Sequence, residues 1–252
     1  MTTLRIDNGK LKIWSACYAL LLLLSGCGGG GGGSAPGPGS SPIYTLQEAQ
    51  QPAKWTILVY LDADNDLEDA AINNFNQMEA IGSTRDVHVI VQMDRKSGDD
   101  SRNARWTDTR RYLITKDSDR AVMHSLRLDQ RALGELDMAD PNTLRDFVQW
   151  GKSQFPAEHY MLVVWDHGSG WTLRALVARP RYKAIAADDT SGNEMNVTEM
   201  AATMAGLRVD VLAFDACCMQ QLEVAYELRN CADYLVASAS TEPAAGYDYS
   251  RV

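Results

Sequence analysis

The sequence has fewer basic than acidic residues, with 24 Lys and Arg against 33 Asp and Glu and a net charge of −9. Binding to DNA or RNA relies on clustered Lys and Arg, so we expect no nucleic acid among the partners. Only four histidines are present, and no pair of them has the spacing of zinc ligands. No glycine-rich segment matches a phosphate-binding loop. The sequence therefore gives no signal of a nucleic-acid-binding, zinc or nucleotide-binding protein.

Cysteine is also scarce, with five residues in 252. Cys17 lies in an N-terminal apolar run and Cys27 follows that run, which leaves Cys217, Cys218 and Cys231. Three cysteines, two of them adjacent, make a poor disulfide framework. If the protein is exported, a free thiol in its folded part therefore requires a functional explanation.

The N-terminus has the pattern of an export signal. Three basic residues (Arg5, Lys10 and Lys12) precede an apolar run at 13–24, which is too short to span a bilayer comfortably. The next residues, Ser25-Gly26-Cys27, complete a segment that resembles a bacterial lipobox. The resemblance implies a signal peptide at 1–26, cleavage before Cys27 and a lipid on its sulfur. A plain secretory signal and an uncleaved anchor are the alternatives.

The segment 27–52 is rich in Gly, Pro and Ser and has the composition of a tether. A spacer of this kind would separate a lipid-anchored globular domain, here 53–252, from the membrane. Gly28 occupies the position where an inner-membrane retention Asp would stand. We therefore expect a lipid-anchored protein of the cell envelope, in the outer membrane of a Gram-negative bacterium.

The rest of the chain alternates apolar strand patterns with amphipathic helix patterns. Near-continuous apolar runs predict strands buried on both faces, and a partly alternating run at 105–115 predicts a further strand or hairpin. Capping signals at Asp140-Pro141 and at Asn196 with Glu199 predict helix starts. This order predicts an α/β domain with a mainly parallel sheet. The strands are expected at 55–61, 87–93, 160–165, 210–214 and 233–238, and the other helices at about 67–81 and 219–229.

Two of these strands end in loops that carry reactive side chains. Asp166-His167-Gly168-Ser169-Gly170 follows the strand at 160–165, and Asp215-Ala216-Cys217-Cys218 follows the strand at 210–214. If the strands are parallel neighbours, His167 and Cys217 emerge at one edge of the sheet, where α/β proteins bind ligands. A thiol requires a nearby imidazole to act as a nucleophile. The N–H groups of Gly168 and Cys217 are candidate oxyanion donors.

Each residue alone has a structural explanation, since a Cys after a strand is often an inert core residue and a His beside Gly often belongs to a loop. The pair at matching strand ends favours function. The segments HGSGW and FDACCM, with WTILVYLDADNDLE, AIAADDTSGNEM and ASTEPAAGYDY in order, resemble the clostripain family of cysteine peptidases, relatives of caspases and gingipains.

The resemblance implies a caspase-like three-layer fold and an endopeptidase that cuts protein or peptide substrates after Arg or Lys. It implies His167 as the catalytic histidine, Cys217 rather than Cys218 as the nucleophile, and Asp215 as part of the pocket for the basic side chain. The sequence departs from the family at Ala244-Ala245, where relatives often carry an acid. Relatives also continue well beyond Val252, so the domain is expected to lack its C-terminal part.

A carboxylate-rich run, 62–66, follows the first strand and looks like the start of a calcium loop. An EF-hand requires Gly at 67 and Glu at 73, where this chain has Leu67 and Asn73. We therefore expect a helix cap here rather than a metal site. No motif supports a cofactor, although calcium remains open.

Two alternative functions of the whole chain stay open. The chain could be a catalytically inactive, lipid-anchored binding protein on a peptidase-like fold, or another thiol-dependent hydrolase or transferase.

Between His167 and Cys217, a stretch rich in basic residues falls in an expected surface loop, where proteolytic cleavage concentrates. Arg181 and Lys183 are the preferred sites of self-cleavage, and a merely soluble loop is the alternative.

Overall fold

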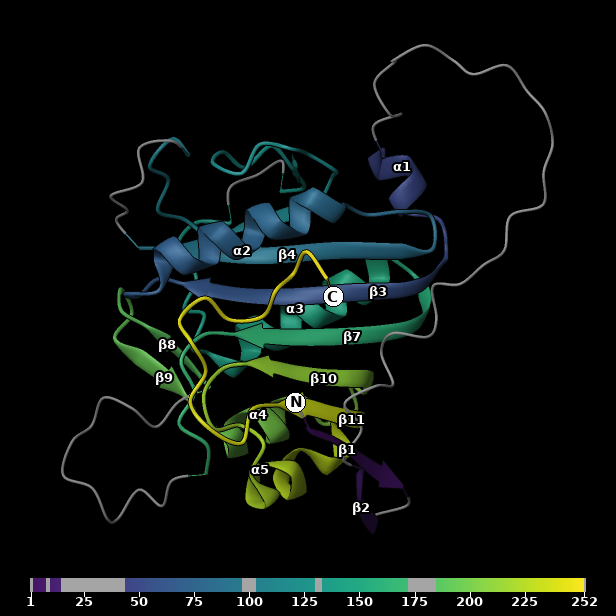
Figure 1. The fold of residues 1–252 in the computed structure, drawn as a ribbon, viewed down its shortest axis with the longest axis vertical. Helices are drawn as coiled ribbons and strands as arrows, with labels where there is room; N and C mark the ends of the chain where they lie inside the picture. Colours follow the sequence, from purple (N-terminus) through teal and green to yellow (C-terminus); the bar gives the residue numbers. More distant parts are fainter. Residues whose placement is uncertain are drawn as a thin grey trace.

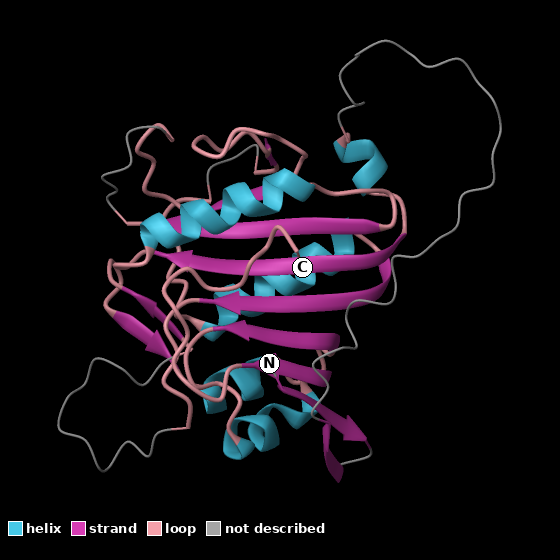
Figure 2. Ribbon diagram, viewed as in Figure 1, coloured by secondary structure: helices cyan, strands magenta, loops and turns pink. Residues whose placement is uncertain are grey.

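A computed structural model describes residues 44–96, 103–129, 133–171 and 185–251, together with the backbone of 2–7 and 10–14. Nine strands form one sheet in the order β2-β1-β11-β10-β7-β3-β4-β5-β6, and Figure 2 shows them as a continuous central layer. Five strands in the middle of the sheet are parallel, whereas β5, β6, β1 and β2 run antiparallel to their neighbours. The parallel strands are β3 (Ala53–Ala63), β4 (Val87–Arg95), β7 (Ala157–Trp165), β10 (Val209–Asp215) and β11 (Ala232–Ala237).

Helices cover both faces of this sheet and give the three layers that the sequence predicts (Figure 1). Alternate residues of β3 show the two faces, because side chains of a strand point to opposite sides. Val59 and Leu61 pack in one buried cluster with α2 (Glu68–Ile81), whereas Leu58 and Tyr60 pack in another. The second cluster includes residues of α1 (Leu46–Ala49), α3 (Pro141–Gln154), α4 (Val197–Thr203), α5 (Leu222–Glu227) and the 3-10 helix η1 (Leu228–Asn230).

The predicted capping signals are confirmed at two helices. The Asp140 side chain accepts from the N–H of Asn142 at the start of α3, with Pro141 as the first helical residue. Asn196 and Glu199 form a reciprocal capping box at α4. The cap expected from the acidic run before α2 is wrong, because its N-cap is Leu67, with no side-chain hydrogen bond. The carboxylates of that run point elsewhere, as described below.

Two further differences concern element bounds. The run at 105–115 forms only β5 (Arg110–Leu113), which pairs with a two-residue strand, β6 (Leu126–Arg127). The sequence predicts a turn at 188–189, which is confirmed for Asp189, whereas Asp188 ends β8 (Ala186–Asp188), which forms a hairpin with β9 (Asn193–Met195). Figure 1 shows this hairpin on the side to which the arrowheads of β3, β7 and β10 point.

The N-terminal segment predicted as a signal peptide contributes two edge strands, β1 (Thr2–Asp7) and β2 (Lys10–Trp14), and β1 pairs with β11. Most of the tether, with Cys27, lies outside the described residues, so export and lipidation remain predictions. Among the described residues, no helix combines the length and apolar character needed to cross a membrane.

Candidate active site

Strand register places His167 and Cys217 at equivalent positions. β7 and β10 are parallel neighbours, and Trp165 is the register partner of Asp215. His167 lies two residues after Trp165, and Cys217 lies two residues after Asp215. The sheet therefore brings the two loops to the same edge, as the sequence predicts.

Gly168 holds the two loops in contact. A Cβ atom at this position would lie 2.3 Å from the carbonyl oxygen and 2.8 Å from the nitrogen of Cys217, closer than real side chains allow. The absence of a side chain thus lets the backbone of the His167 loop reach the Cys217 peptide.

The Cys217 thiol lies between this contact and the loop that follows β11. Cys217 is half-buried and carries a free thiol, and its Sγ accepts from the backbone N–H of Glu242 at 3.2 Å. Cys218 has a φ of 63°, a left-handed conformation that is unusual for a residue with a side chain, and its N–H bonds the carbonyl of Ser240 at 2.9 Å. The left-handed backbone at Cys218 is thus held by a hydrogen bond to the loop that follows β11.

His167 contacts a carboxylate from another strand end. Its Nε2 lies 2.7 Å from Oδ1 of Asp66, in the loop after β3, and about a third of the His167 side chain is exposed. The sequence analysis considered the run that contains Asp66 only as a calcium loop or a helix cap, not as a partner of His167. A signal was available, because the acidic run at 62–66 follows the strand that pairs with β7 on its other side.

Asp215, the predicted pocket residue, is buried and already engaged by the protein. Both of its carboxylate oxygens accept from the N–H of Tyr247, at 3.1 and 3.0 Å, and Oδ2 accepts from the hydroxyl of Tyr249 at 2.9 Å. Gly246, with a φ of 61°, passes so close that a Cβ there would lie 2.6 Å from Oδ2. These contacts make Asp215 a brace for 246–249, and a role in substrate binding stays a prediction.

Glu242 lies beside Asp215 and is electrostatically linked to it. Burial and the neighbouring Asp215 raise the pKa of Glu242 to about 8, and burial also raises the pKa of Asp215. Glu242 is therefore mostly protonated at neutral pH and can donate a hydrogen bond to Asp215. In the sequence, Glu242 stands out only as part of a family segment.

Asp166, next to His167, connects the carboxyl edge of the sheet to the β8–β9 hairpin. Its Oδ1 accepts from Nδ2 of Asn65 at 2.7 Å, and its Oδ2 accepts from the backbone N–H of Ala187. Burial raises the pKa of this carboxyl well above its usual range, against the lowering effect of these hydrogen bonds. Asp166 thus fixes the loop that carries His167.

A cavity of about 400 Å³ opens beside His167, between its loop and the hairpin. Four of its lining residues are acidic, and the others come from the His167 loop, the loop after β3 and the β8–β9 hairpin. The lining residues are Asn65, Asp66, His167, Gly168, Ser169, Ala187, Asp188, Asp189, Gly192, Asn193 and Glu194. The space next to His167 is therefore open to a ligand and negatively charged.

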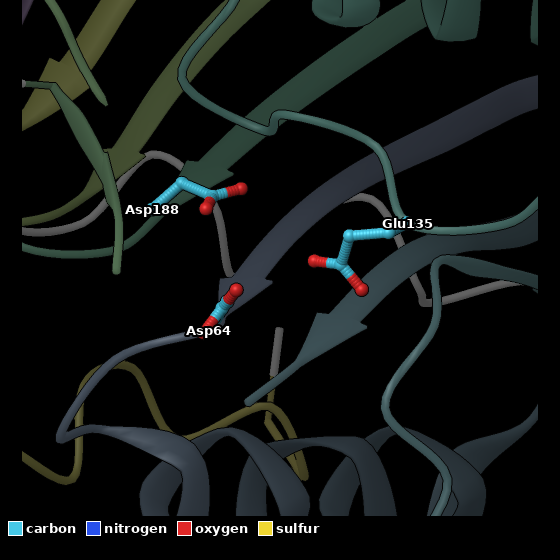
Figure 3. Close-up of side chains that lie close together, drawn as sticks. All are labelled: Asp64, Glu135 and Asp188. Atoms are coloured by element: carbon cyan, nitrogen blue, oxygen red, sulfur yellow. The ribbon is translucent and has the colours of Figure 1, made fainter. Parts of the chain in front are cut away.

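Three carboxylates gather near this cavity, although the sequence predicts no metal ligands. Asp64, Glu135 and Asp188 point toward one another from three separate segments (Figure 3). Burial, together with Asp64 and Asp188, raises the pKa of Glu135 to about 7. Because the three residues are far apart in sequence, no spacing motif could reveal them.

The remaining predicted site residues lie outside the described part of the chain. They are Cys27, for lipidation, and Arg181 and Lys183, for self-cleavage. Their roles stay predictions.

The chain is similar in sequence to known cysteine peptidases. The model of the clostripain family matches residues 59–252. Clostripain from Hathewaya histolytica is 30% identical over 226 residues, which cover 79% of this chain and 41% of that protein. The chain thus spans less than half the length of this curated relative.

Solved structures agree in fold. A secreted C11 cysteine protease from Bacteroides thetaiotaomicron, in complex with an irreversible peptide inhibitor, has a TM-score of 0.60 and 27% identity. An inactive zymogen of a C11 protease from Parabacteroides distasonis has a TM-score of 0.61 and 23% identity. Each match covers 79% of this chain and 52% of the solved chain. The family model, the shared fold and the order of the His167 and Cys217 segments lead to one assignment: this chain belongs to the clostripain family.

Proposed function

We propose that this protein is a cysteine endopeptidase that hydrolyses peptide bonds after Arg or Lys, with Cys217 as nucleophile and His167 as its acid–base partner. The observation that carries the proposal is the contact of Gly168 with the Cys217 peptide, which joins the two loops where both side chains emerge. The family supplies the reaction class. Because the chain covers about half of its solved relatives, the activity is proposed for this chain and is not transferred from them.

In the proposed reaction, His167 takes the thiol proton and the Cys217 sulfur attacks the carbonyl carbon of the substrate. The resulting oxyanion accepts hydrogen bonds from the N–H groups of Cys217 and Gly168. His167 then gives its proton to the leaving amine, and water hydrolyses the thioester. If Nε2–H of His167 donates to Asp66, Nδ1 is the nitrogen that exchanges this proton.

The substrate preference is the finer part of the proposal. Asp215 and Glu242 place two carboxyl groups beneath the Cys217 loop, and a carboxylate there can pair with a basic side chain of the substrate. The acidic residues that line the cavity beside His167 also favour a positively charged substrate.

The nucleophile is tested with a peptide that carries Arg before the cleaved bond. Cys217→Ala is expected to abolish its hydrolysis, whereas the matched variant Cys218→Ala keeps most of it. The assay uses this chain beside any longer product of the same gene. Labelling of Cys218 by an alkylating peptide would move the nucleophile by one residue. Binding of the peptide without turnover in the parent protein would favour the inactive binding protein instead.

Export, anchoring and self-processing complete the proposal. Cys27→Ser is expected to release the protein from the membrane fraction or to block its maturation, as fractionation would show. One solved relative is an inactive zymogen, which is in line with activation by self-cleavage after Arg181 or Lys183. N-terminal sequencing should find a new terminus after one of these residues, and find it missing in Cys217→Ala. An intact and fully active chain would exclude self-processing.

A further inference from the structure

Large apolar side chains are exposed next to the two loops of the candidate active site. The structure describes five exposed large apolar residues, and three of them follow the His167 and Cys217 loops in the chain. These three, called the apolar patch below, are Trp171, Leu222 and Tyr226, with exposed fractions of 38%, 60% and 62%. Exposed apolar residues that lie together mark a binding site more often than scattered single ones do.

A contact between the two loops brings the members of the apolar patch together. The backbone N–H of Trp171 donates to Oε1 of Gln221 at 2.7 Å, and Gln221 is the N-cap of α5, four residues after Cys217. Leu222 is the first residue of α5. Tyr226 comes four residues later, on the same side of the helix. The apolar patch therefore begins where the two loops of the site meet.

The surroundings of Asp215 and the apolar patch lie on opposite faces of the sheet. Tyr247 and Tyr249, which donate to Asp215, pack in the buried cluster that includes α2. In contrast, α5 contributes Val224 and Ala225 to the cluster on the other face. A substrate whose basic side chain points toward Asp215 therefore has the apolar patch on its opposite side.

The geometry of an extended peptide decides which substrate residue reaches the apolar patch. Neighbouring side chains of an extended chain point to opposite sides, so the residues just before and just after the basic residue both face away from Asp215. His167, at the end of β7, has to protonate the leaving amine, so the residue after the cleaved bond lies toward β7. Figure 1 shows α5 on the other side of β10, where β11 lies. The residue before the basic residue is therefore the one that reaches the patch.

We propose that Trp171 and Leu222 bind an apolar side chain of the substrate, on the residue immediately before Arg or Lys. The proposal rests on the proposed function and adds a second determinant of its substrate. An aliphatic or aromatic side chain at this place would cover apolar surface that now contacts water, and such burial is favourable. The guanidinium carbon of Arg229 lies 4.0 Å from the centre of the Tyr226 ring, so Tyr226 already has a partner and is left out of the proposal.

The experiment measures peptide binding to Cys217→Ala, so its outcome does not depend on turnover. Two fluorescently labelled peptides differ only in the residue before Arg, which is Leu in one and Asn in the other, two uncharged side chains of similar size. The Leu peptide is expected to bind about five- to twenty-fold more tightly, as burial of much of one apolar side chain predicts. A second pair of peptides has the same exchange in the residue after Arg, and its members should bind alike.

Leu222→Asn, added to Cys217→Ala, is the decisive variant, because Leu222 is exposed and its replacement should not disturb folding. It is expected to remove most of the preference for the Leu peptide, and Trp171→Ala should act in the same direction. The matched control is Ile81→Asn, an exposed apolar residue at the last position of α2, which should keep the preference.

Three results would overturn the apolar site: equal binding of the Leu and Asn peptides, a preference that persists in Leu222→Asn, or a preference only in the second pair. Failure of the protein with intact Cys217 to hydrolyse either peptide would count against the proposed activity instead. If the preference for the Leu peptide and its dependence on Leu222 were then still present, they would support the apolar site.

Discussion

Two groups of carboxylates lie at the carboxyl edge of the sheet, and they differ in what satisfies their oxygens. Asp215, beneath the Cys217 loop, receives hydrogen bonds from Tyr247 and Tyr249. Asp62 and Asp64, at the end of β3, each keep one buried oxygen without a donor in the described part of the chain. The carboxylate of Asp215 is satisfied by its own polypeptide, whereas Asp62 and Asp64 each keep an oxygen that the described residues leave without a donor.

This difference assigns separate tasks to the two sides of His167. The Asp215 side shapes the loop that carries Cys217, and the Asp64 side supports the wall of the cavity beside His167. His167 lies between them, bound to Asp66 from the β3 side and joined through Gly168 to Cys217. Variants on one side should therefore leave the property of the other side unchanged, and this separation can be tested.

Among the variants that test this separation, the largest effect is expected at His167. His167→Ala should lower the turnover of an Arg peptide by about 10²–10⁴-fold, the usual contribution of a general acid–base group. Steady-state kinetics measures this loss, and the unfolding temperature of the same variant should stay close to that of the parent. His159→Ala, a partly exposed histidine at the opposite end of β7 paired with Asp210, is the control and should keep the parent rate. A His167→Ala enzyme with the parent rate would remove His167 from the mechanism.

Asp215→Asn tests whether Asp215 only supports the segment 246–249 or also binds the basic side chain of the substrate. If Asp215 pairs with the basic side chain, kcat/KM for Arg and Lys peptides should fall about ten- to a hundred-fold relative to neutral peptides, the equivalent of about 1.5–3 kcal/mol. Tyr249→Phe is the comparison, because it removes one donor to Asp215 and keeps the carboxylate. It should lower the unfolding temperature and leave the preference for basic residues intact. Equal loss on all peptides in Asp215→Asn would make Asp215 purely structural.

A smaller effect is expected on the way the unfolding temperature depends on pH. The pKa of Glu242 is raised from 4.5 to about 8, so the folded state holds its proton more tightly than the unfolded state. Its contribution to stability is complete below pH 4.5 and is lost as the pH rises through about 8. Glu242→Gln should therefore show a shallower fall of the unfolding temperature between about pH 5 and 8. Glu223→Gln, on the exposed part of α5, should follow the parent. A parent-like slope in Glu242→Gln would contradict the assignment.

The sheet and its reactive edge could be predicted because their signals are local. β3, β7 and β10 are continuous apolar runs, and a strand buried on both faces has this pattern in any parallel sheet. Asn196 and Glu199 mark the start of α4 through two residues alone. The offset of His167 and Cys217 from these strands then follows from the sequence itself.

The acidic cluster could not be predicted, because it depends on which loops meet in space, and the contact of His167 with Asp66 had only the position of the acidic run as a signal. Glu135 and Asp188 come from segments with no pattern that relates them to Asp64. The short strands β8 and β9 are three residues each, too short for a periodic signal. The acidic run at 62–66 suggested a helix cap, but burial and neighbours beyond the helix decide the contacts of its carboxylates.

The register of β7 and β10 sets the relative position of His167 and Cys217. Because Trp165 and Asp215 are paired, each of the two residues lies the same number of positions beyond one level of the sheet. Inserting one residue in either strand would advance its loop by about 3.3 Å and reverse the faces of the side chains that follow. Insertions and deletions inside β7 or β10 should therefore be far more damaging than most point substitutions there. In a library of single-residue insertions, few active variants should carry their insertion in either strand.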